Sequence, residues 1–436
     1  MEPRFICGNL SLGPNGRLFF AGQDTSVLAE KYGTPLYLLD ADHIRAKCRL
    51  FKRCLTDAFG GRGHILYASK AASFKRIYEI MNEEDMCVDV VSPGEIYTAL
   101  KAGFPPERAW FHSNNKSDED IAFAIDHGIG HFVIDSTEEL LAVNAAAAER
   151  GIRQKLLLRL TPGIDTHTFE AVDTGKVDSK FGFAIETGQA EEIFRLALTL
   201  ANIDLRGFHC HVGSQLFDSD VFLRSAKIML DFMAHVKAKY GYEAEQLNLG
   251  GGFGVPYVLS DPEPDIESIL KETADGIRSM CREHGMKMPE IGFEPGRCIV
   301  ADAGLTLYTV GMVKKIPGFI NYVSVDGGMT DNPRYALYGA EYTVLPAGRM
   351  EEDRNMICSV VGRCCESGDI IQPDVPMPET MRRGDLVAVC TTGAYNYSMA
   401  SNYNRVPRPP VVMLSGGESY VAVKRETLDD MLMLDE

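Results

Sequence analysis

Between about residues 65 and 297, apolar and polar positions repeat in one pattern. A short apolar run ends on a polar or glycine cluster, and an amphipathic segment follows before the next run, as in alternating strands and helices. We therefore predict a series of strands, each followed by a helix. The eight runs are "ILYASK" (65–70), "CVDVVS" (87–92), "AWFHSN" (109–114), "HFVIDS" (131–136), "KLLLRLTP" (155–162), "LRGFHCHVG" (205–213), "QLNLGGGFG" (246–254) and "EIGFEPGR" (290–297).

Two of the intervening segments carry a clear helical signature. Residues 137–150 follow Ser136, a residue type that caps helix N-termini, and residues 220–240 carry apolar positions at helical spacing. Strand–helix units of this number in about 230 residues match a (β/α)8 barrel. A doubly wound open sheet shows the same alternation, so the pattern by itself leaves that alternative.

Polar residues accumulate where the predicted strands end, and this favours the barrel. Active sites of such barrels form at the C-terminal ends of the strands. The residues at these ends are Lys70, Asp89, His112, Asp135, Arg159, His209, His211 and Glu294.

The rest of the chain has a different texture. After residue 300, β-rich runs such as "LTLYTVGMVKKI" (305–316) and "DLVAVCTTGAY" (385–395) are broken by Gly and Pro, which predicts a separate antiparallel β domain. The first 35 or so residues do not fit the barrel repeat.

Charge and composition argue against nucleic acid, membranes and zinc as partners of this protein. The formal net charge of −17 would repel a nucleic-acid backbone, and no apolar run is long enough to span a membrane. The eleven cysteines are scattered without CxxC pairs, which indicates reduced thiols rather than disulfides or a zinc site. We expect a cytoplasmic protein that binds neither nucleic acid nor membranes.

Lys70 ends the first apolar run, with small residues on either side. Most lysines are solvated surface charges. At the end of a barrel strand, however, partial loss of water would make the amine a nucleophile toward aldehydes. A Schiff-base lysine is the hypothesis, and it fits an aldolase as well as an enzyme that uses pyridoxal phosphate (PLP).

His209 and His211 lie two apart on one predicted strand and so share a face. Such a pair could present two ligands to zinc, given further ligands such as His112, Asp89 or Asp135 from other strands. His211 could instead stack on an aromatic cofactor. For His209 in particular, a histidine satisfied by neighbours in the core is also a sound interpretation.

Two glycine-containing segments suggest anion binding. "LGGGFG" (249–254) is most simply a turn, but after a late barrel strand its backbone amides could enclose a phosphate, with Ser214 adding a hydroxyl. In "FEPGR" (293–297), Glu294 and Arg297 could form an ordinary ion pair. With a PLP ring present, Glu294 would keep the ring nitrogen protonated.

Cys365, in "CCESGD" (364–369), lies in a polar, glycine-containing loop of the β-rich part. Most cysteines are inert packing residues, although this setting suits a reactive thiol. Its spacing alone assigns it no role.

Together these motifs resemble the fold-type III PLP-dependent decarboxylases, and within them the branch that acts on diaminopimelate. The resemblance covers nearly the whole chain. The matching segments are "YASKA" (67–71), "DVVSPGE" (89–95), "HSNNKS" (112–117), "LTPGIDTHT" (160–168), "DTGKVDSKFG" (173–182), "HVGS" (211–214), "GGGFG" (250–254), "EPGR" (294–297), "DGGMTDNPRYALYGA" (326–340), "CESGD" (365–369) and "GAYNYSMASNYN" (393–404).

The resemblance implies PLP-dependent decarboxylation of meso-2,6-diaminopimelate to L-lysine and CO2, the last step of lysine biosynthesis. It implies a PLP-binding (β/α)8 barrel over residues 38–300, and a β-rich domain formed by residues 1–37 with 301–436. It further implies a homodimer with shared active sites, in which the Cys365 loop completes the neighbour's site. No metal is expected.

The resemblance also implies roles for single residues. Catalytic roles fall to Lys70, Cys365, His211 and Glu294. PLP would contact Lys70, Asp89, His211, Ser214, Gly250, Gly251, Gly252, Glu294, Pro295, Gly296, Arg297 and Tyr395. Substrate would contact Arg297, Arg334, Tyr338, Glu366 and Tyr395.

The chain departs from the family pattern at "TPGID", where Asn often precedes Pro, and at "RYALY", where Tyr335 replaces a common proline. Three rival functions remain: decarboxylation of ornithine, lysine or arginine, a non-catalytic homologue, and a metal-dependent hydrolase, which would require the PLP motifs to be coincidence. "CESGD", "HSNNKS" and "SKFG" argue against the first. Retention of Lys70 and Cys365 argues against the second.

Overall fold

Two compact units divide the chain in the computed structural model, which describes residues 5–164 and 179–436. One unit, the barrel unit, comprises residues 47–254 and 263–296. The other, the β unit, comprises the chain up to residue 46, residues 255–262 and everything from residue 297 onward. Each unit is therefore built from segments that are far apart in the sequence.

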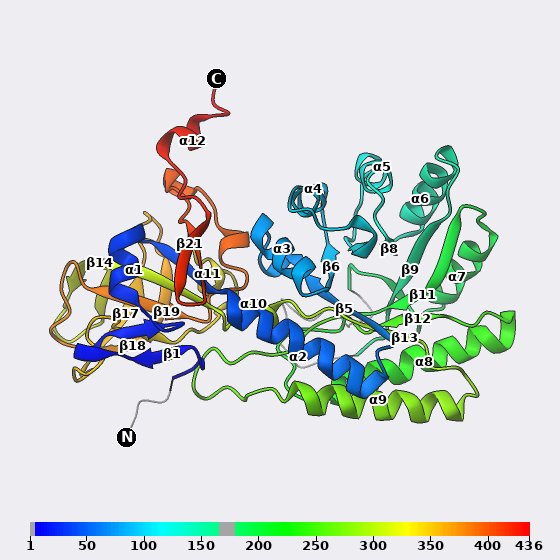
Figure 1. The fold of residues 1–436 in the computed structure, drawn as a ribbon, viewed down its shortest axis with the longest axis horizontal. Helices are drawn as coiled ribbons and strands as arrows, with labels where there is room; N and C mark the ends of the chain where they lie inside the picture. Colours follow the sequence, from blue (N-terminus) through cyan, green and yellow to red (C-terminus); the bar gives the residue numbers. More distant parts are fainter. Residues whose placement is uncertain (1–4, 165–178) are drawn as a thin grey trace. The chain divides into compact units, whose positions relative to one another are not determined.

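Eight parallel strands close into a barrel (Figure 1). The last of them, β13, pairs with the first, β5, so the sheet has no open edge. Every one of the eight predicted strands is confirmed, and the open-sheet alternative is wrong. The strands are β5 (Gly63–Ala68), β6 (Cys87–Val90), β7 (Ala109–Phe111), β8 (His131–Ile134), β9 (Gln154–Thr161), β11 (Ile203–His209), β12 (Gln246–Asn248) and β13 (Glu290–Phe293).

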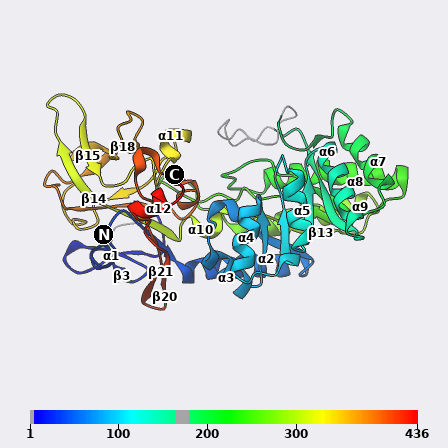
Figure 2. The same ribbon diagram turned by 90° about the horizontal axis from the view of Figure 1, so that it is seen from above.

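Helices alternate with the barrel strands along the chain and lie around them (Figures 1 and 2). The two predicted helices are confirmed: α6 begins after Ser136, whose hydroxyl accepts a hydrogen bond from the Glu139 amide (3.2 Å), and α8 occupies the expected residues. The helices are α2 (Ala41–Phe59), α3 (Lys75–Glu83), α4 (Pro93–Lys101), α5 (Asp118–Asp126), α6 (Thr137–Glu149), α7 (Gln189–Thr199), α8 (Asp220–Tyr240) and α9 (Ile266–Glu283).

Side-chain alternation along the barrel strands separates an apolar layer from a polar one. Leu66, Trp110, Val133 and Leu157 form one buried cluster. Because successive strand side chains point to opposite faces, residues two positions further on share the face of this cluster. Those residues are Ala68, His112, Asp135 and Arg159, at or just past the strand ends.

The β unit contains a nine-stranded sheet that is mostly antiparallel, as predicted. Two pairings are parallel, β15 with β17 and β20 with β4, so the sheet is mixed. Its strands are β4 (Leu36–Asp40), β14 (Gly304–Lys314), β15 (Asn321–Val325), β16 (Val344–Leu345), β17 (Met356–Val361), β18 (Ile370–Met377), β19 (Leu386–Cys390), β20 (Val411–Ser415) and β21 (Glu418–Val423).

Two features of this sheet were not foreseen from the pattern. Strand β18 was missed because Pro373 and Pro376 interrupt its apolar sequence, and proline usually signals an edge strand or a break. Strand β4, from the N-terminal segment, lies inside the sheet between β14 and β20. A strand from the N-terminal part of the chain thus shares one sheet with strands from the C-terminal part.

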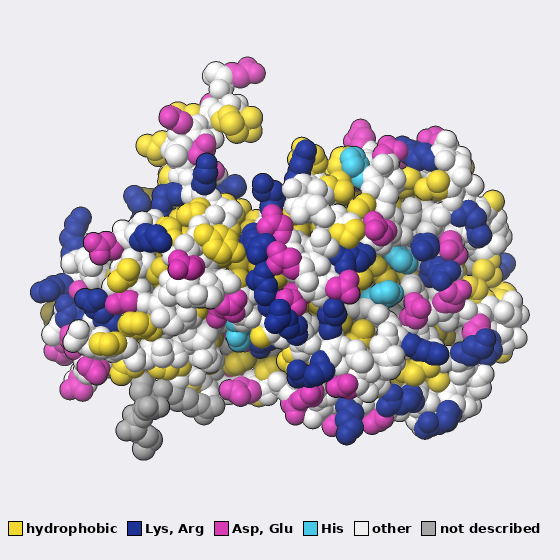
Figure 3. Space-filling view, viewed as in Figure 1, with side chains coloured by type: hydrophobic (Ala, Val, Ile, Leu, Met, Phe, Trp, Pro, Cys, Tyr) yellow, Lys and Arg dark blue, Asp and Glu magenta, His cyan; other side chains and the backbone are white. Residues whose placement is uncertain are grey.

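On the face shown in Figure 3, acidic and basic side chains are interspersed over the surface. None of the helices in residues 5–164 and 179–436 is long and apolar enough to cross a bilayer.

Lys116 and Glu139 form a buried ion pair in the barrel unit. The ammonium of Lys116, in the loop after β7, lies 2.6 Å from a carboxylate oxygen of Glu139 on α6. It also donates to the backbone carbonyl of Val133 (2.8 Å), and the second oxygen of Glu139 accepts from the Asp135 amide (3.0 Å). The pair therefore ties the β7 loop to the end of β8.

Removing one partner of such a pair leaves a buried charge without compensation, which costs about 3 kcal/mol or more. We therefore expect Lys116→Met to lower the free energy of unfolding by that amount. Lys116→Met combined with Glu139→Gln should recover much of the loss, because glutamine is neutral and can still accept from the Asp135 amide. Urea denaturation followed by circular dichroism measures both, with exposed Lys75→Met as control. A double variant no more stable than the single one would contradict this account.

Candidate active site

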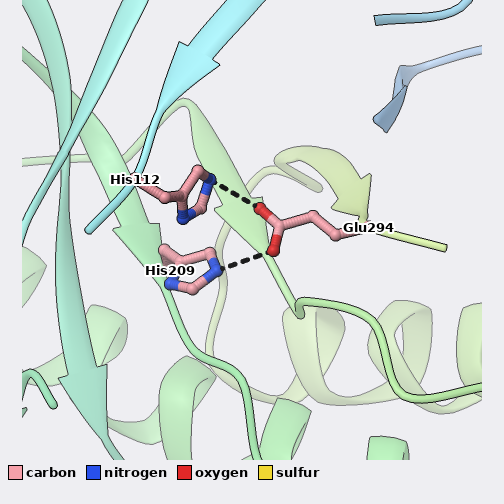
Figure 4. A group of neighbouring side chains, drawn as sticks. All are labelled: His112, His209 and Glu294. Atoms are coloured by element: carbon pink, nitrogen blue, oxygen red, sulfur yellow. Dashed lines mark hydrogen bonds and ion pairs between the residues drawn. The ribbon is translucent and has the colours of Figure 1, made fainter. Parts of the chain in front are cut away.

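A buried carboxylate, Glu294, stands at the centre of the polar layer of the barrel, just past the end of β13. One oxygen lies 3.0 Å from Nε2 of His112, and the other lies 3.2 Å from Nε2 of His209 (Figure 4). The side-chain amide of Asn248 donates to the first oxygen at 2.8 Å. Groups from β11, β12 and the end of β7 thus converge on the carboxylate that follows β13.

These contacts decide the protonation of Glu294. Burial alone would raise its pKa, but the neighbouring His112 and His209 outweigh burial and hold the pKa well below its usual value. Burial lowers the pKa of His209 to about 4, so this ring is neutral. Burial acts the same way on His112, yet Asp89 and Glu294 raise the pKa of His112 above its ordinary value. The site therefore pairs a carboxylate anion with a histidine that readily carries a proton.

Asp89, at the end of β6, is another buried carboxylate of the polar layer. Burial raises its pKa, and nearby Glu294 adds to the rise. Among the described residues its Oδ1 atom has no hydrogen-bond partner, although it is buried. A buried polar atom left in this way is typical of a site that a ligand completes.

His211 follows β11 and faces the glycine segment after β12. Its Nδ1 accepts a hydrogen bond from the Gly251 amide at 3.2 Å. Burial lowers its pKa well below the ordinary value, and the positive charge of Lys70 lowers it further. His211 is therefore a neutral, flat ring with one nitrogen fixed by the backbone.

The glycine segment passes very close to its neighbours. At Gly250, which has φ +72°, a Cβ would lie 2.6 Å from the carbonyl oxygen of Cys210. At Gly251 a Cβ would lie 2.1 Å from the carbonyl oxygen of Glu294. Gly252 is equally close to the chain at Gly213, and Ser214 follows in the same loop after β11. Only glycine allows this approach, which leaves backbone rather than side chains lining the loop.

Lys70 does not lie on a strand. Strand β5 ends at Ala68, and Lys70 occupies the following 3-10 turn (Ser69–Ala71), where its side chain is exposed. The expected loss of water around this amine is therefore not present in the structure, because the turn lifts the residue beyond the buried strand. The same turn adjoins Pro295 and Gly296: the Ala68 amide donates to the Pro295 carbonyl (3.2 Å), and Gly296 packs against Ala68.

In the β unit, two buried arginines meet at one phenol. Nη1 of Arg297 and Nη1 of Arg334 donate to the hydroxyl of Tyr257 at 2.8 and 2.9 Å. The guanidinium groups also lie over the ring of Tyr395, which has φ +60°, at 4.8 and 5.7 Å from its centroid. Tyr338 ends the short helix α11 (Arg334–Tyr338) and is partly exposed.

Cys365 and Glu366 lie in the loop between β17 and β18, and both are exposed. The Cys365 amide donates to the side chain of Asn404 (3.0 Å), and Glu366 accepts from the Gly368 amide (3.2 Å). The adjacent Cys364 is less exposed than Cys365, and burial raises the pKa of the Cys364 thiol to about 11. The exposed cysteine of the pair is thus the one in the predicted motif.

The predicted residues fall into three groups. The barrel unit gathers Lys70, Asp89, His211, Ser214, Gly250, Gly251, Gly252, Glu294, Pro295 and Gly296. The β unit holds Arg297, Arg334 and Tyr395 together, while Cys365 and Glu366 lie on their own loop. The motifs at 160–168 and 173–182 run into residues 165–178, which lie outside the described residues.

Some partners were not predicted as site residues. His112, His209 and Asn248 support Glu294, and Tyr257 joins the two arginines. The two histidines were visible as polar strand ends. Nothing in the local sequence of Asn248 or Tyr257 indicated a partner, since each contacts residues far along the chain.

The barrel site can be tested for its fit to PLP or a metal. His112, His209 and Glu294 offer ligand atoms within 4.8 Å of one another, a set that zinc also accepts. PLP requires more: an anionic carboxylate for the ring nitrogen, a close backbone loop for the phosphate and a lysine for the aldehyde. Glu294, Gly250–Gly252 and Lys70 meet these needs, and the unpartnered oxygen of Asp89 adds a further contact for a ligand.

Comparison with known proteins agrees with this fit. The family model for the pyridoxal binding domain of pyridoxal-dependent decarboxylases matches residues 41–301. The diaminopimelate decarboxylase of Bacillus subtilis is 44% identical over 431 residues, which cover 99% of this chain and 98% of the relative. That of Mycobacterium tuberculosis is 40% identical over 428 residues, covering 96% and 95%.

Solved structures show the same likeness. A diaminopimelate decarboxylase from M. jannaschii in complex with L-lysine has a TM-score of 0.88 at 32% identity, with 99% of both chains covered. The Helicobacter pylori enzyme with L-lysine has a TM-score of 0.85 at 32% identity, covering 94% of this chain and 99% of that one. The chain belongs to the pyridoxal-dependent decarboxylase family, with diaminopimelate decarboxylases among its relatives.

Proposed function

We propose that this protein removes CO2 from meso-2,6-diaminopimelate to form L-lysine, with PLP as cofactor. The observation that carries the proposal is Glu294, held as an anion by two histidines on the polar layer of a barrel whose family binds PLP. Relatives named for this reaction match the chain from end to end.

The barrel residues suit the cofactor. When bound, PLP takes up the electron pair left by the loss of CO2 into its protonated ring. Glu294 would face the ring nitrogen, and neutral His211 would lie against the ring. Lys70 would hold the aldehyde carbon. The phosphate would lie against the backbone at Gly250, Gly251 and Gly252, where no side chain intervenes, with Ser214 beside it.

Residues of the β unit suit the substrate. Diaminopimelate keeps one carboxylate when the other leaves, and a guanidinium binds a carboxylate through two parallel hydrogen bonds. Arg297 and Arg334 would bind this retained group, with Tyr338 and Tyr395 beside it. Glu366 would bind the distant ammonium, and Cys365 would give a proton to the reacting carbon.

The assignment of segments to roles is part of the proposal. Residues 38–300 would form the PLP-binding barrel, and residues 1–37 with 301–436 would form the domain that completes the site. We propose a homodimer in which the exposed Cys365–Glu366 loop serves the neighbouring copy. All eleven cysteines lie in the described chain and are thiols, which supports a reducing, cytosolic location.

The first test is an absorbance spectrum of the purified protein followed by assay of CO2 and L-lysine. A yellow protein that converts meso-diaminopimelate and leaves ornithine, arginine and lysine unchanged is the expected result. A yellow protein that converts ornithine or lysine instead would move the substrate to another amino acid. A yellow protein with no activity would indicate a non-catalytic homologue.

Cys365→Ala should lower kcat by about 100-fold, because it removes a positioned proton donor. PLP absorbance should remain, since the thiol holds no part of the cofactor. The adjacent Cys364→Ala is the matched control and should turn over normally. Unchanged kcat in Cys365→Ala would remove this thiol from the mechanism.

The shared site can be tested by mixing two inactive variants. Lys70→Ala and Cys365→Ala subunits, unfolded and refolded together, would form mixed dimers in which one of the two sites has both native residues. About a quarter of native activity should return. If each chain built its site alone, the mixture would stay inactive.

Arg334→Lys should raise KM for meso-diaminopimelate by about tenfold or more, because lysine lacks the fork that grips a carboxylate. Binding of cadaverine, a diamine without a carboxylate, should change little. Steady-state kinetics and calorimetry measure the two effects. Equal weakening of both ligands would show that Arg334 does not read the carboxylate.

A further inference from the structure

One buried phenol in the β unit holds two cations. Tyr257 lies in the segment that follows the glycine loop, and its hydroxyl accepts hydrogen bonds from Nη1 of both Arg297 and Arg334, at 2.8 and 2.9 Å. The three side chains are each less than a tenth exposed. A single oxygen therefore sets the spacing between two guanidinium groups.

Within the described chain, the guanidinium of Arg334 makes hydrogen bonds through only one of its nitrogen atoms. Its Nη1 atom donates to Tyr257 and, at 3.3 Å, to the hydroxyl of Tyr342. Its Nε and Nη2 atoms make no hydrogen bond within the described chain, and these two atoms form the edge that grips a carboxylate. The tyrosines thus fix the guanidinium while its binding edge stays available.

The positive charge of Arg334 is only partly compensated by its neighbours. Within residues 5–164 and 179–436, Arg334 pairs with no carboxylate, and its hydrogen-bond partners are tyrosine hydroxyls. Its neighbours are aromatic faces, with the centroids of Tyr257, Tyr395 and Tyr342 at 5.2, 5.7 and 5.9 Å. Buried charges are usually paired, so a buried guanidinium held by phenols suits an anionic ligand.

The neighbouring charges and the hydrogen bonds at Tyr257 both favour negative charge on its hydroxyl oxygen. Burial would raise its pKa, but Arg297 and Arg334 outweigh burial and lower it. The hydroxyl already accepts two hydrogen bonds from cations, which favours negative charge on the oxygen. Tyr342 differs, because its hydroxyl accepts from Arg334 but not from Arg297 within the described chain, and donates its own proton to Asn396 at 3.3 Å.

We propose that Tyr257 is a positioning residue for the carboxylate that the substrate retains. Its hydroxyl holds Arg297 and Arg334 at the separation at which both can contact one carboxylate. The inference rests on the proposed function, since it takes that carboxylate to be the ligand of the two arginines. Tyr257 itself need not touch the substrate.

The test compares two ligands of the PLP-loaded protein. L-lysine carries the retained carboxylate, and cadaverine is the same diamine without it. Tyr257→Phe removes one oxygen atom and keeps the ring, and it should weaken L-lysine binding about tenfold, as expected for loss of a hydrogen bond to a charged group. Cadaverine binding should be unchanged by calorimetry. In turnover, KM for meso-diaminopimelate should rise while kcat stays nearly constant.

Two tyrosine variants serve as matched controls. Tyr342→Phe removes a hydroxyl that contacts one arginine only, so its effect on L-lysine should be smaller. Tyr242→Phe removes a hydrogen bond to the Leu205 carbonyl at the N-terminal side of the barrel strands, and it should have no effect on either ligand. Circular dichroism and the PLP absorbance verify folding of each variant.

The outcomes separate the inference from the proposed function. If Arg334→Lys weakens L-lysine binding and Tyr257→Phe does not, Tyr257 is no positioning residue and the substrate assignment stands. If Tyr257→Phe weakens L-lysine and cadaverine equally, its role is general packing and the inference is overturned. If neither variant affects L-lysine, the carboxylate assignment itself fails.

A second variant covers poor folding of Tyr257→Phe. Tyr257→His is then used in place of Tyr257→Phe. Its preference for L-lysine over cadaverine should also be lower than that of the native protein. A preserved preference would overturn the inference.

Discussion

A carboxylate buried inside a closed barrel is the constraint on which the cofactor site depends. Glu294 would lose its charge on burial if it stood alone, and a neutral acid could not hold a proton on a pyridine nitrogen. His112, His209 and Asn248 keep it ionised, and they come from three different strands or strand ends. The charge therefore exists only because the barrel closes with these strands in their observed register.

The barrel supplies two layers with different tasks. Leu66, Trp110, Val133 and Leu157 fill the interior with apolar contacts. Two residues further along the strands, the side chains become polar and can interact with one another without contact with bulk water. The buried pair Lys116 and Glu139 fixes the loops around this second layer.

The β unit buries two positive charges close together, those of Arg297 and Arg334. Both guanidinium groups donate to the hydroxyl of Tyr257 and lie over the ring of Tyr395. A carboxylate partner inside the protein would neutralise Arg334 permanently and compete with any anionic ligand. Tyrosine stabilises the cation less completely, so an incoming carboxylate still improves its pairing.

The sequence by itself determined the elements and most chemistry-bearing residues. All eight barrel strands followed from apolar runs, and the helices at 137–150 and 220–240 from periodicity and a cap, since these signals are local. Proline hid β18, and the turn after β5 left Lys70 more exposed than expected. Only the tertiary structure paired Glu294 with His112 and His209, and Tyr257 with two arginines. Those partners lie far apart in the sequence, and their contacts depend on strand order, register and closure, which no local pattern encodes.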